Sequence, residues 1–294
     1  MKAHQKLTAG SHGFKADFQN ARTTTHGLTI PEGLHNVSRI RTYFLTHIGN
    51  DSMECFNSPY GTQYFEKYAE RIPGESTNVL SKAAADHNIL LFGGTIPERC
   101  DKKLYNTMPV FNSSGKLLCT FRKVHLFDIS IPGGITFRES DKLTGGIEPV
   151  IVDNGFAKFG LGICYDCRFI EMAKLYGSKG CQVMIYPGAF NMTTGPLHWE
   201  LAARSLAVHT QSYVLFCSPA RDTSASYVAW GHSLIVDPWG KVIAAADAGE
   251  ETIYADLDLD IVDTVRKSIP IWPQRRLDVY DITEKQQIKI VTDN

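Results

Sequence analysis

The chain has 294 residues, of which 43% are hydrophobic and 21% charged, and its formal net charge is −1. This composition is typical of a globular protein with enough apolar side chains for a sizeable core. A nearly neutral chain offers no electrostatic basis for binding nucleic acid or a membrane surface. No apolar run is long enough to cross a bilayer. We therefore expect neither of these partners.

The cysteines and the N-terminal segment bear on location. Seven cysteines, an odd number, are scattered through apolar surroundings, which predicts reduced thiols in the cytoplasm rather than a disulfide framework. Residues 1–47 are basic, poor in acids and without clear apolar periodicity. We expect an atypical, disordered extension there, with a mitochondrial transit peptide as the alternative, followed by one domain over residues 48–294.

Apolar runs and helical patterns alternate from residue 54 onward. The pattern predicts helices over 64–70, 77–86, 169–177 and 196–212, and strands over 88–95, 104–111, 117–122, 160–164, 183–186, 213–218, 231–236 and 241–245. Asn112–Gly115 predicts a hairpin turn. Strand pairs joined by short turns, interleaved with helices, do not form a pure βαβ series. We therefore predict an α/β fold with a mixed sheet covered by helices on one face.

The segment 160–170, GLGICYDCRFI, places Cys164 at the end of a predicted strand and shortly before a predicted helix. A cysteine in this position is usually a small buried apolar residue. The free N–H groups of a helix's first turn, however, would stabilise a thiolate and an oxyanion. Arg168 follows one turn later and suits a clamp for a substrate carboxylate. Cys164 is therefore our candidate nucleophile.

Cys164 and Cys167 also form a C-x-x-C match, which is typical of dithiol redox sites and of half a zinc site. No second pair of cysteines or histidines follows at metal spacing, so we predict no metal site. The motif also lies past the midpoint of the chain, whereas a thioredoxin-like site comes early in a small domain. A dithiol oxidoreductase remains an alternative function.

Two further segments hold charged groups in apolar surroundings. Lys123 in RKVHLFDI is either a lysine that reaches from a strand edge to solvent, or a cation that holds a thiolate and an oxyanion. Glu54 in SMECFNSPYG is either a surface carboxylate or, in a partly buried loop, a general base. His125, His198 and His232 are alternative bases.

These segments together resemble the nitrilase (carbon–nitrogen hydrolase) superfamily, and its omega-amidase branch in particular. The matching stretches run in order over 54–76, 93–98, 104–107, 121–129, 135–140, 160–169, 186–208, 218–222, 226–240 and 275–280. The resemblance implies an α-β-β-α sandwich that forms a homodimer and needs no metal or organic cofactor.

The resemblance also implies a Glu–Lys–Cys triad, carried here by Glu54, Lys123 and Cys164, with Glu139 in ITFRES as an additional carboxylate. Glu54 would deprotonate the thiol, and Cys164 would attack an amide carbon and form a thioester. Lys123 and the N–H of Tyr165 would hold the oxyanion.

The branch resemblance implies a short dicarboxylic monoamide as substrate, such as 2-oxoglutaramate or 2-oxosuccinamate. Arg168 would then bind the substrate carboxylate, and Tyr60, Phe190 and Thr194 would line the pocket with Tyr165. Two alternatives stay open. One is the sister activity, a deaminated-glutathione amidase, and the other is a catalytically impaired homologue that acts as a binding or dimerising protein.

The chain departs from the family pattern before Glu54. Members begin with a core strand, a helix and a second strand that ends in proline, whereas this chain reads TYFLTHIGNDSM with Met53 in place of the proline. Residues 1–47 either replace the first strand and helix or leave them absent. In the second case a sheet edge would be exposed and the loop that carries Glu54 would lose support.

Overall fold

In the computed structural model, residues 39–46 and 54–293 are described. Most of the atypical N-terminal segment (residues 1–38 and 47) lies outside the described residues, so its predicted disorder stays a prediction. Its remaining part, Arg39–Thr46, forms strand β1. β1 pairs antiparallel with β14 (Glu251–Asp258) over eight residue pairs, from Arg39 opposite Asp258 to Thr46 opposite Glu251. A strand therefore does occupy part of this segment.

The largest sheet has seven strands in the order β13-β12-β11-β10-β9-β8-β15. Its central strands, β9 (Lys158–Leu161), β10 (Val183–Pro187) and β11 (Tyr213–Cys217), run parallel, and their side chains are almost all buried. The flanking strands are β8 (Val150–Asp153), β12 (Leu234–Val236), β13 (Val242–Ala245) and β15 (Lys289–Thr292), and the sheet contains both parallel and antiparallel pairs.

The second sheet has four strands, with β4 (Lys103–Phe111) paired antiparallel to β2 (Leu91–Phe92), β3 (Ile96–Cys100) and β5 (Leu117–Arg122). The predicted hairpin turn joins β4 to β5. Asn112 Oδ1 accepts hydrogen bonds from the N–H groups of Ser114 and Lys116, and Gly115 has φ 79°, a conformation that glycine adopts without strain.

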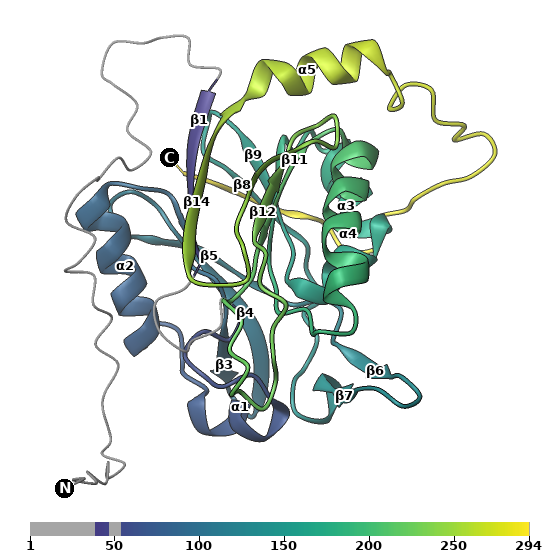
Figure 1. Ribbon diagram of the computed structural model, residues 1–294. Coiled ribbons are helices and arrows are strands. Elements are labelled where there is room, and N and C mark those ends of the chain that lie inside the picture. The colour runs from purple at the N-terminus through teal and green to yellow at the C-terminus, as the bar shows by residue number, and fades with distance from the viewer. Residues whose placement is uncertain (1–38, 47–53, 294) are drawn as a thin grey trace, which may run out of the picture.

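Helices cover both outer faces of the paired sheets (Figure 1). On one side, α2 (Glu75–His87) lies against the four-stranded sheet, and on the other α3 (Ile170–Ser178) and α4 (Gly195–Thr210) lie against the seven-stranded sheet. One apolar core joins residues of both sheets, and the rings of Phe92 and Phe159 meet across it with centroids 5.1 Å apart. The α/β fold with mixed sheets in an α-β-β-α arrangement is thus confirmed.

Smaller elements complete the chain. α1 (Thr62–Tyr68) precedes α2, and α5 (Leu259–Ser268) follows β14, with the Asp258 carboxylate accepting a hydrogen bond from the N–H of Asp260 at its start. A hairpin of β6 (Asp128–Ser130) and β7 (Thr136–Arg138) projects from the body in Figure 1. Within the described residues, no helix combines the length and apolar character needed to span a membrane.

Most predicted elements end within three residues of the observed ones, and for two of them the structure shows a local cause of the difference. The strand predicted over 88–95 is limited to Leu91–Phe92, because Gly94 has φ 63° and turns the chain toward β3. The strand predicted to run to Cys164 ends at Leu161, and Cys164–Arg168 form a 3₁₀ helix before α3 begins at Ile170. The chain therefore turns sharply at the candidate nucleophile itself.

Candidate active site

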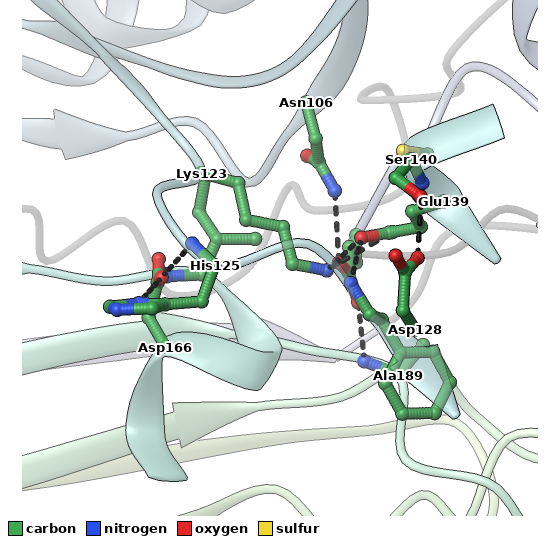
Figure 2. A network of polar contacts seen from close by, with 12 residues as sticks. Asn106, Lys123, His125, Asp128, Glu139, Ser140, Asp166 and Ala189 are labelled. Carbon is green, nitrogen blue, oxygen red and sulfur yellow. Dashed lines mark hydrogen bonds and ion pairs between the residues drawn. The ribbon is translucent and has the colours of Figure 1, made fainter. Parts of the chain in front are cut away.

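Lys123 lies at the centre of a buried polar network (Figure 2). It follows β5, has no solvent-exposed surface, and its main-chain N–H donates to the carbonyl of Asn106 on the neighbouring strand at 2.8 Å. Its Nζ lies 2.8 Å from Glu54 Oε1 and 2.9 Å from Glu139 Oε2. A lysine that reaches from a strand edge to solvent is therefore excluded. One cation is shared between two buried carboxylates.

Glu54 is also fully buried, and several donors fix its carboxylate. Oε1 accepts from Asn106 Nδ2 at 2.9 Å in addition to Lys123, and Oε2 accepts from the N–H of Ala189 at 2.9 Å. Asn106 and Ala189, both labelled in Figure 2, thus donate to different oxygens of this carboxylate. Burial and the nearby charge of Glu54 both raise the pKa of the Cys164 thiol, so this carboxylate lies within electrostatic reach of the thiol. The carboxylate is therefore oriented toward the candidate nucleophile by groups from three separate segments.

The loop after Glu54 is anchored by residues C-terminal to it. The N–H of Cys55 donates to Thr95 Oγ1 at 2.7 Å, and the N–H of Phe56 donates to the Thr95 carbonyl at 2.9 Å. Asn57 Nδ2 donates to Glu70 Oε1 at 2.9 Å. These contacts supply support for Glu54 that does not depend on the atypical N-terminal segment.

Glu139 holds the other side of the lysine. It begins a short 3₁₀ helix directly after β7 and has no exposed surface. Its Oε1 accepts from the Tyr60 hydroxyl at 3.0 Å, and its Oε2 accepts from the N–H of Phe127 at 2.7 Å. Burial raises the pKa of Glu139, the charge of Lys123 opposes this shift, and the charge of Glu54 reinforces it.

Cys164 begins the 3₁₀ helix with φ 45°, an uncommon conformation for a residue other than glycine. Such backbone strain is concentrated at functional sites. The chain passes very close to it at Gly188, where a Cβ atom would lie 2.9 Å from Cys164 Cα and 3.4 Å from its Sγ. Only a glycine at position 188 leaves room for the thiol beside the segment that binds Glu54.

The electrostatics of the network favour a neutral thiol at rest. Burial raises the pKa of Cys164 well above its ordinary value, the charge of Glu54 raises it further, and Lys123 opposes both. Burial by itself lowers the pKa of Lys123, but Glu139 and Glu54 outweigh it, so the net pKa is raised and the lysine stays charged. A thiolate would thus form by passing its proton to Glu54, which moves a negative charge without adding one.

Asp166 ties the Cys164 turn to the lysine segment. This buried carboxylate accepts from the N–H of Ile163 at 2.9 Å, just before the nucleophile. It also accepts from the main-chain N–H of His125 at 2.8 Å and contacts His125 Nδ1 at 2.8 Å (Figure 2). One side chain therefore connects the residue before Cys164 with a residue two positions after Lys123.

Aromatic rings pack beside the network. Tyr60 stacks on Phe137 with centroids 5.6 Å apart and contacts Tyr227 at 4.7 Å. Tyr165 meets Phe127 edge to face at 5.2 Å. These rings, which come from loops and from the β6–β7 hairpin, surround the polar groups with apolar surface. Charged interactions are stronger in such an environment than in water.

The remaining predicted residues lie further out. Arg168 is exposed, its guanidinium lies 4.7 Å from the centroid of the buried Phe190 ring, and its Nη1 is 3.2 Å from His198 Nδ1. Thr194 precedes α4, and its N–H and hydroxyl both contact Asn191 Oδ1. Its carbonyl accepts from the N–H of His198 at 2.8 Å, so the hydrogen bonds described for Thr194 run to Asn191 and His198. The structure brings Glu54, Lys123, Glu139, Cys164 and Tyr60 together, and places Arg168 with Phe190.

The comparisons with known proteins agree with this geometry. The family model described as carbon–nitrogen hydrolase matches residues 54–267. The chain belongs to the carbon–nitrogen hydrolase family. It is similar to "Omega-amidase NIT2" of Danio rerio, with 56% identity over 80% of this chain and 84% of that protein. For "Omega-amidase NIT2" of Homo sapiens the identity is 54% over 79% of this chain and 84% of that protein.

Solved structures extend the likeness to the fold. The crystal structure of Saccharomyces cerevisiae Nit3, a member of branch 10 of the nitrilase superfamily, matches with a TM-score of 0.73 and 42% identity. The match covers 81% of this chain and 97% of that chain. The NitFhit protein of C. elegans matches with a TM-score of 0.67 and 33% identity, over 73% of this chain and 54% of that chain. The predicted membership of the carbon–nitrogen hydrolase family, and with it a hydrolase, is confirmed.

The three alternative bases and the second cysteine of the C-x-x-C match have surroundings in this carbon–nitrogen hydrolase that differ from those of Lys123 and Glu54. His125 is paired with Asp166, His198 with Arg168, and His232 lies 3.3 Å from Arg221 Nη2. Cys167 is a free, buried thiol whose pKa burial raises to about 12, which disfavours a reactive dithiol. Among the described residues, no group of three or more His, Cys, Asp or Glu is arranged to hold a metal ion.

Sequence reasoning missed several groups that hold the site. Asn106 and the N–H of Ala189 bind Glu54, the Tyr227 hydroxyl binds the Ala189 carbonyl, and Asp166 holds the Cys164 turn. All four residues lie within the stretches that resemble the family. Their position within these stretches is the signal that could have identified them, because their spacing along the chain does not indicate that they meet.

Proposed function

We propose that this carbon–nitrogen hydrolase is an omega-amidase that releases ammonia from short dicarboxylic monoamides, such as 2-oxoglutaramate and 2-oxosuccinamate. The proposal rests chiefly on one observation, the buried Lys123 shared by two carboxylates, one of which, Glu54, acts electrostatically on the buried Cys164 thiol. It is supported by relatives called omega-amidase with 54–57% identity to this chain.

The first half of the proposed reaction forms a thioester. Glu54 takes the proton of the Cys164 thiol as Sγ bonds to the amide carbon, and the carbonyl oxygen becomes an oxyanion. Lys123 Nζ and the N–H of Tyr165 donate to that oxygen. When the C–N bond breaks, Glu54 returns the proton to the leaving nitrogen. Ammonia departs, and the acyl group remains on sulfur.

The second half reverses these roles with water. Glu54 takes a proton from a water molecule, whose oxygen attacks the thioester carbon. The C–S bond then breaks, the sulfur regains the proton from Glu54, and the carboxylic acid leaves. Glu139 is a positioning residue in this scheme, because its carboxylate holds Lys123 Nζ from the side opposite Glu54.

Arg168 is the proposed recognition group for the second carboxylate of the substrate. It is exposed, it carries a permanent positive charge, and its guanidinium lies 4.7 Å from the centroid of the Phe190 ring. A planar guanidinium suits bidentate binding of a carboxylate. Tyr60, Tyr165 and Thr194 are proposed neighbours of the bound substrate. The same residues would then determine whether the larger deaminated glutathione can bind.

The decisive experiment compares Cys164→Ala with the unchanged enzyme on 2-oxoglutaramate. We expect ammonia release from the unchanged chain and none from Cys164→Ala, because the alanine cannot form the thioester. Unchanged release by the variant would contradict the mechanism. Activity of the unchanged chain on deaminated glutathione alone would reassign the substrate. A folded protein inactive on both amides would support the impaired-homologue alternative.

A homodimer is part of the same proposal. Leu197, Leu201 and Val208 are 67%, 65% and 49% exposed, and their spacing places them on one face of α4. A second copy of the chain would cover this apolar face. Light scattering should then give about twice the 32.7 kDa of the single chain, and substitution of Leu201 by lysine should lower that mass.

A further inference from the structure

Tyr227 lies in a stretch, SYVAWGHS, to which the reaction above assigns no role. We propose that Tyr227 is a positioning residue for the catalytic base, and that it acts through the main chain of Ala189. The proposal rests on the proposed function of Glu54 as that base. It concerns how Glu54 is held rather than which amide is hydrolysed.

The connection consists of two short hydrogen bonds. The Tyr227 hydroxyl donates to the carbonyl of Ala189 at 2.6 Å, and the N–H of Ala189 donates to Glu54 Oε2 at 2.9 Å. Ala189 is 1% exposed and has no polar side chain of its own. The neighbouring residues are held by the main chain, because the N–H of Gly188 donates to the Cys217 carbonyl at 2.8 Å and the Phe190 carbonyl accepts from the N–H of Trp230 at 2.7 Å. The Tyr227 hydroxyl adds a side-chain contact to the Ala189 carbonyl itself, directly beside the N–H group that binds Glu54.

Tyr60 provides the matching contact on the other side of the site. Its hydroxyl donates to Glu139 Oε1 at 3.0 Å, and its ring lies 4.7 Å from that of Tyr227. The rings of the two tyrosines thus pack together, and their hydroxyls bind different groups. Tyr60 binds Glu139, which holds Lys123, and Tyr227 binds the carbonyl of Ala189, whose N–H binds Glu54.

The effect of Tyr227 should be visible in the pH dependence of the reaction. A hydrogen bond donated to a carboxylate stabilises its charged form, so the charged base would be less well stabilised when the Ala189 contact weakens. The other titratable groups that interact with Glu54 are Cys55, Tyr60, Lys123, Glu139, Cys164 and Cys167. These groups remain the same in the unchanged enzyme and in a Tyr227 variant, so a difference in pH dependence between the two proteins reports on Tyr227.

The test is Tyr227→Phe, which removes the hydroxyl and keeps the ring. We expect kcat to fall about tenfold with KM changed less than twofold, and the acidic limb of the kcat/KM profile to move up by about 0.5–1 pH unit. The pH dependence of iodoacetamide alkylation at Cys164, located by peptide mass spectrometry, should shift in the same direction. This second readout needs no substrate, so it tests the role of Tyr227 even where the assigned amide is wrong.

Tyr213→Phe is the matched control. Tyr213 is a buried tyrosine whose hydroxyl also donates to a carbonyl, that of Asp258 at 2.9 Å, and it belongs to β11. Both variants should lower the unfolding temperature by similar amounts, but only Tyr227→Phe should move the acidic limbs. Equal limbs in the two variants would overturn the proposal. A rise in KM with unchanged kcat would overturn it as well, since Tyr227 would then bind substrate directly.

Discussion

The buried centre of the site and its outer rim are built in opposite ways. The centre consists of Glu54, Lys123, Glu139 and Cys164, which are at most 3% exposed and bind one another or nearby main-chain groups. The outer rim, Arg168 with His198 and Thr194, is exposed or half-buried. Arg168 Nη1 lies 3.2 Å from His198 Nδ1, whereas Lys123 Nζ is held by two carboxylates at 2.8 and 2.9 Å.

This difference separates chemistry from selectivity. A charged group in the centre is held by several partners from distant segments, so a change there alters the fold as well as the reaction. A rim side chain in solvent can change with little effect on its neighbours. We therefore expect substitutions in the centre to cost stability and turnover together, and those on the rim to alter substrate preference alone.

The largest effect is expected for Lys123→Met, which removes the cation and keeps most of the side-chain volume. Two buried carboxylates would then face each other unpaired, which costs about 3–5 kcal/mol of unfolding free energy, and turnover should disappear. Urea denaturation measures the first effect. The double variant Lys123→Met, Glu139→Gln should recover part of the stability because it removes one charge, but none of the activity. Equal stability of the two variants would refute the charge explanation.

Gly188→Ala should act on geometry alone. A Cβ atom there would lie 2.9 Å from Cys164 Cα, so the nucleophile or the Ala189 segment must move by some tenths of an ångström. We expect kcat to fall about 10- to 100-fold, since small displacements of reacting groups have effects of this size. Gly249→Ala is the control, because a Cβ at that position meets nothing within 4 Å. Comparable losses in both variants would show that the close approach at Cys164 is unimportant.

The interior near the centre should also respond to alkaline pH. Burial raises the pKa of Cys167 from 9.0 to about 12, so its protonated form is favoured in the folded chain. Its contribution to stability is complete below pH 9 and is lost as the pH rises toward 12, at up to about 1.4 kcal/mol per pH unit. Unfolding free energies at pH 8, 9 and 10 should decline less steeply in Cys167→Ala. An identical slope in the variant would argue against this thiol as a source of the decline.

The smallest structural effect is expected on the rim. Arg168→Ala should raise KM for a dicarboxylic monoamide about tenfold or more, because a charge-assisted hydrogen bond to the substrate is lost. Its kcat and its unfolding free energy should change little, the latter by less than about 0.5 kcal/mol. A neutral amide of similar length serves as the comparison substrate, and its KM should not change. A large loss of stability would mean that the contrast between centre and rim is wrong.

Local context made Cys164 a candidate nucleophile, because it follows a predicted strand and precedes a predicted helix. It left two interpretations each for Lys123 and Glu54, and the triad was implied by the resemblance to the family. The mixed α/β fold followed from the alternation of strand pairs and helices. A polar residue that lies between apolar neighbours is buried together with them when the chain folds. Such a local context therefore helps to predict a buried polar group.

The supporting groups could not be predicted in the same way. Asn106 meets Glu54 across 52 residues, and Tyr227 meets Ala189 across 38, distances that only the packed sheets and loops close. The 3₁₀ turn at Cys164 was also missed, because it depends on the Asp166 side chain capturing the N–H of Ile163. Contacts of this kind arise from tertiary packing, so they cannot be predicted from the periodicity of the sequence.

The arrangement of one lysine between two carboxylates has a consequence for the response to salt. Proton transfer from Cys164 to Glu54 leaves the total charge of this cluster unchanged, and its side chains are at most 3% exposed, so salt screens them little. Ionic strength should therefore leave kcat nearly constant. Attraction of an anionic substrate to the exposed Arg168 is screened within about 10 Å at 0.1 M salt. Rising salt should then lower kcat/KM, so that a simple titration with sodium chloride distinguishes substrate capture from turnover.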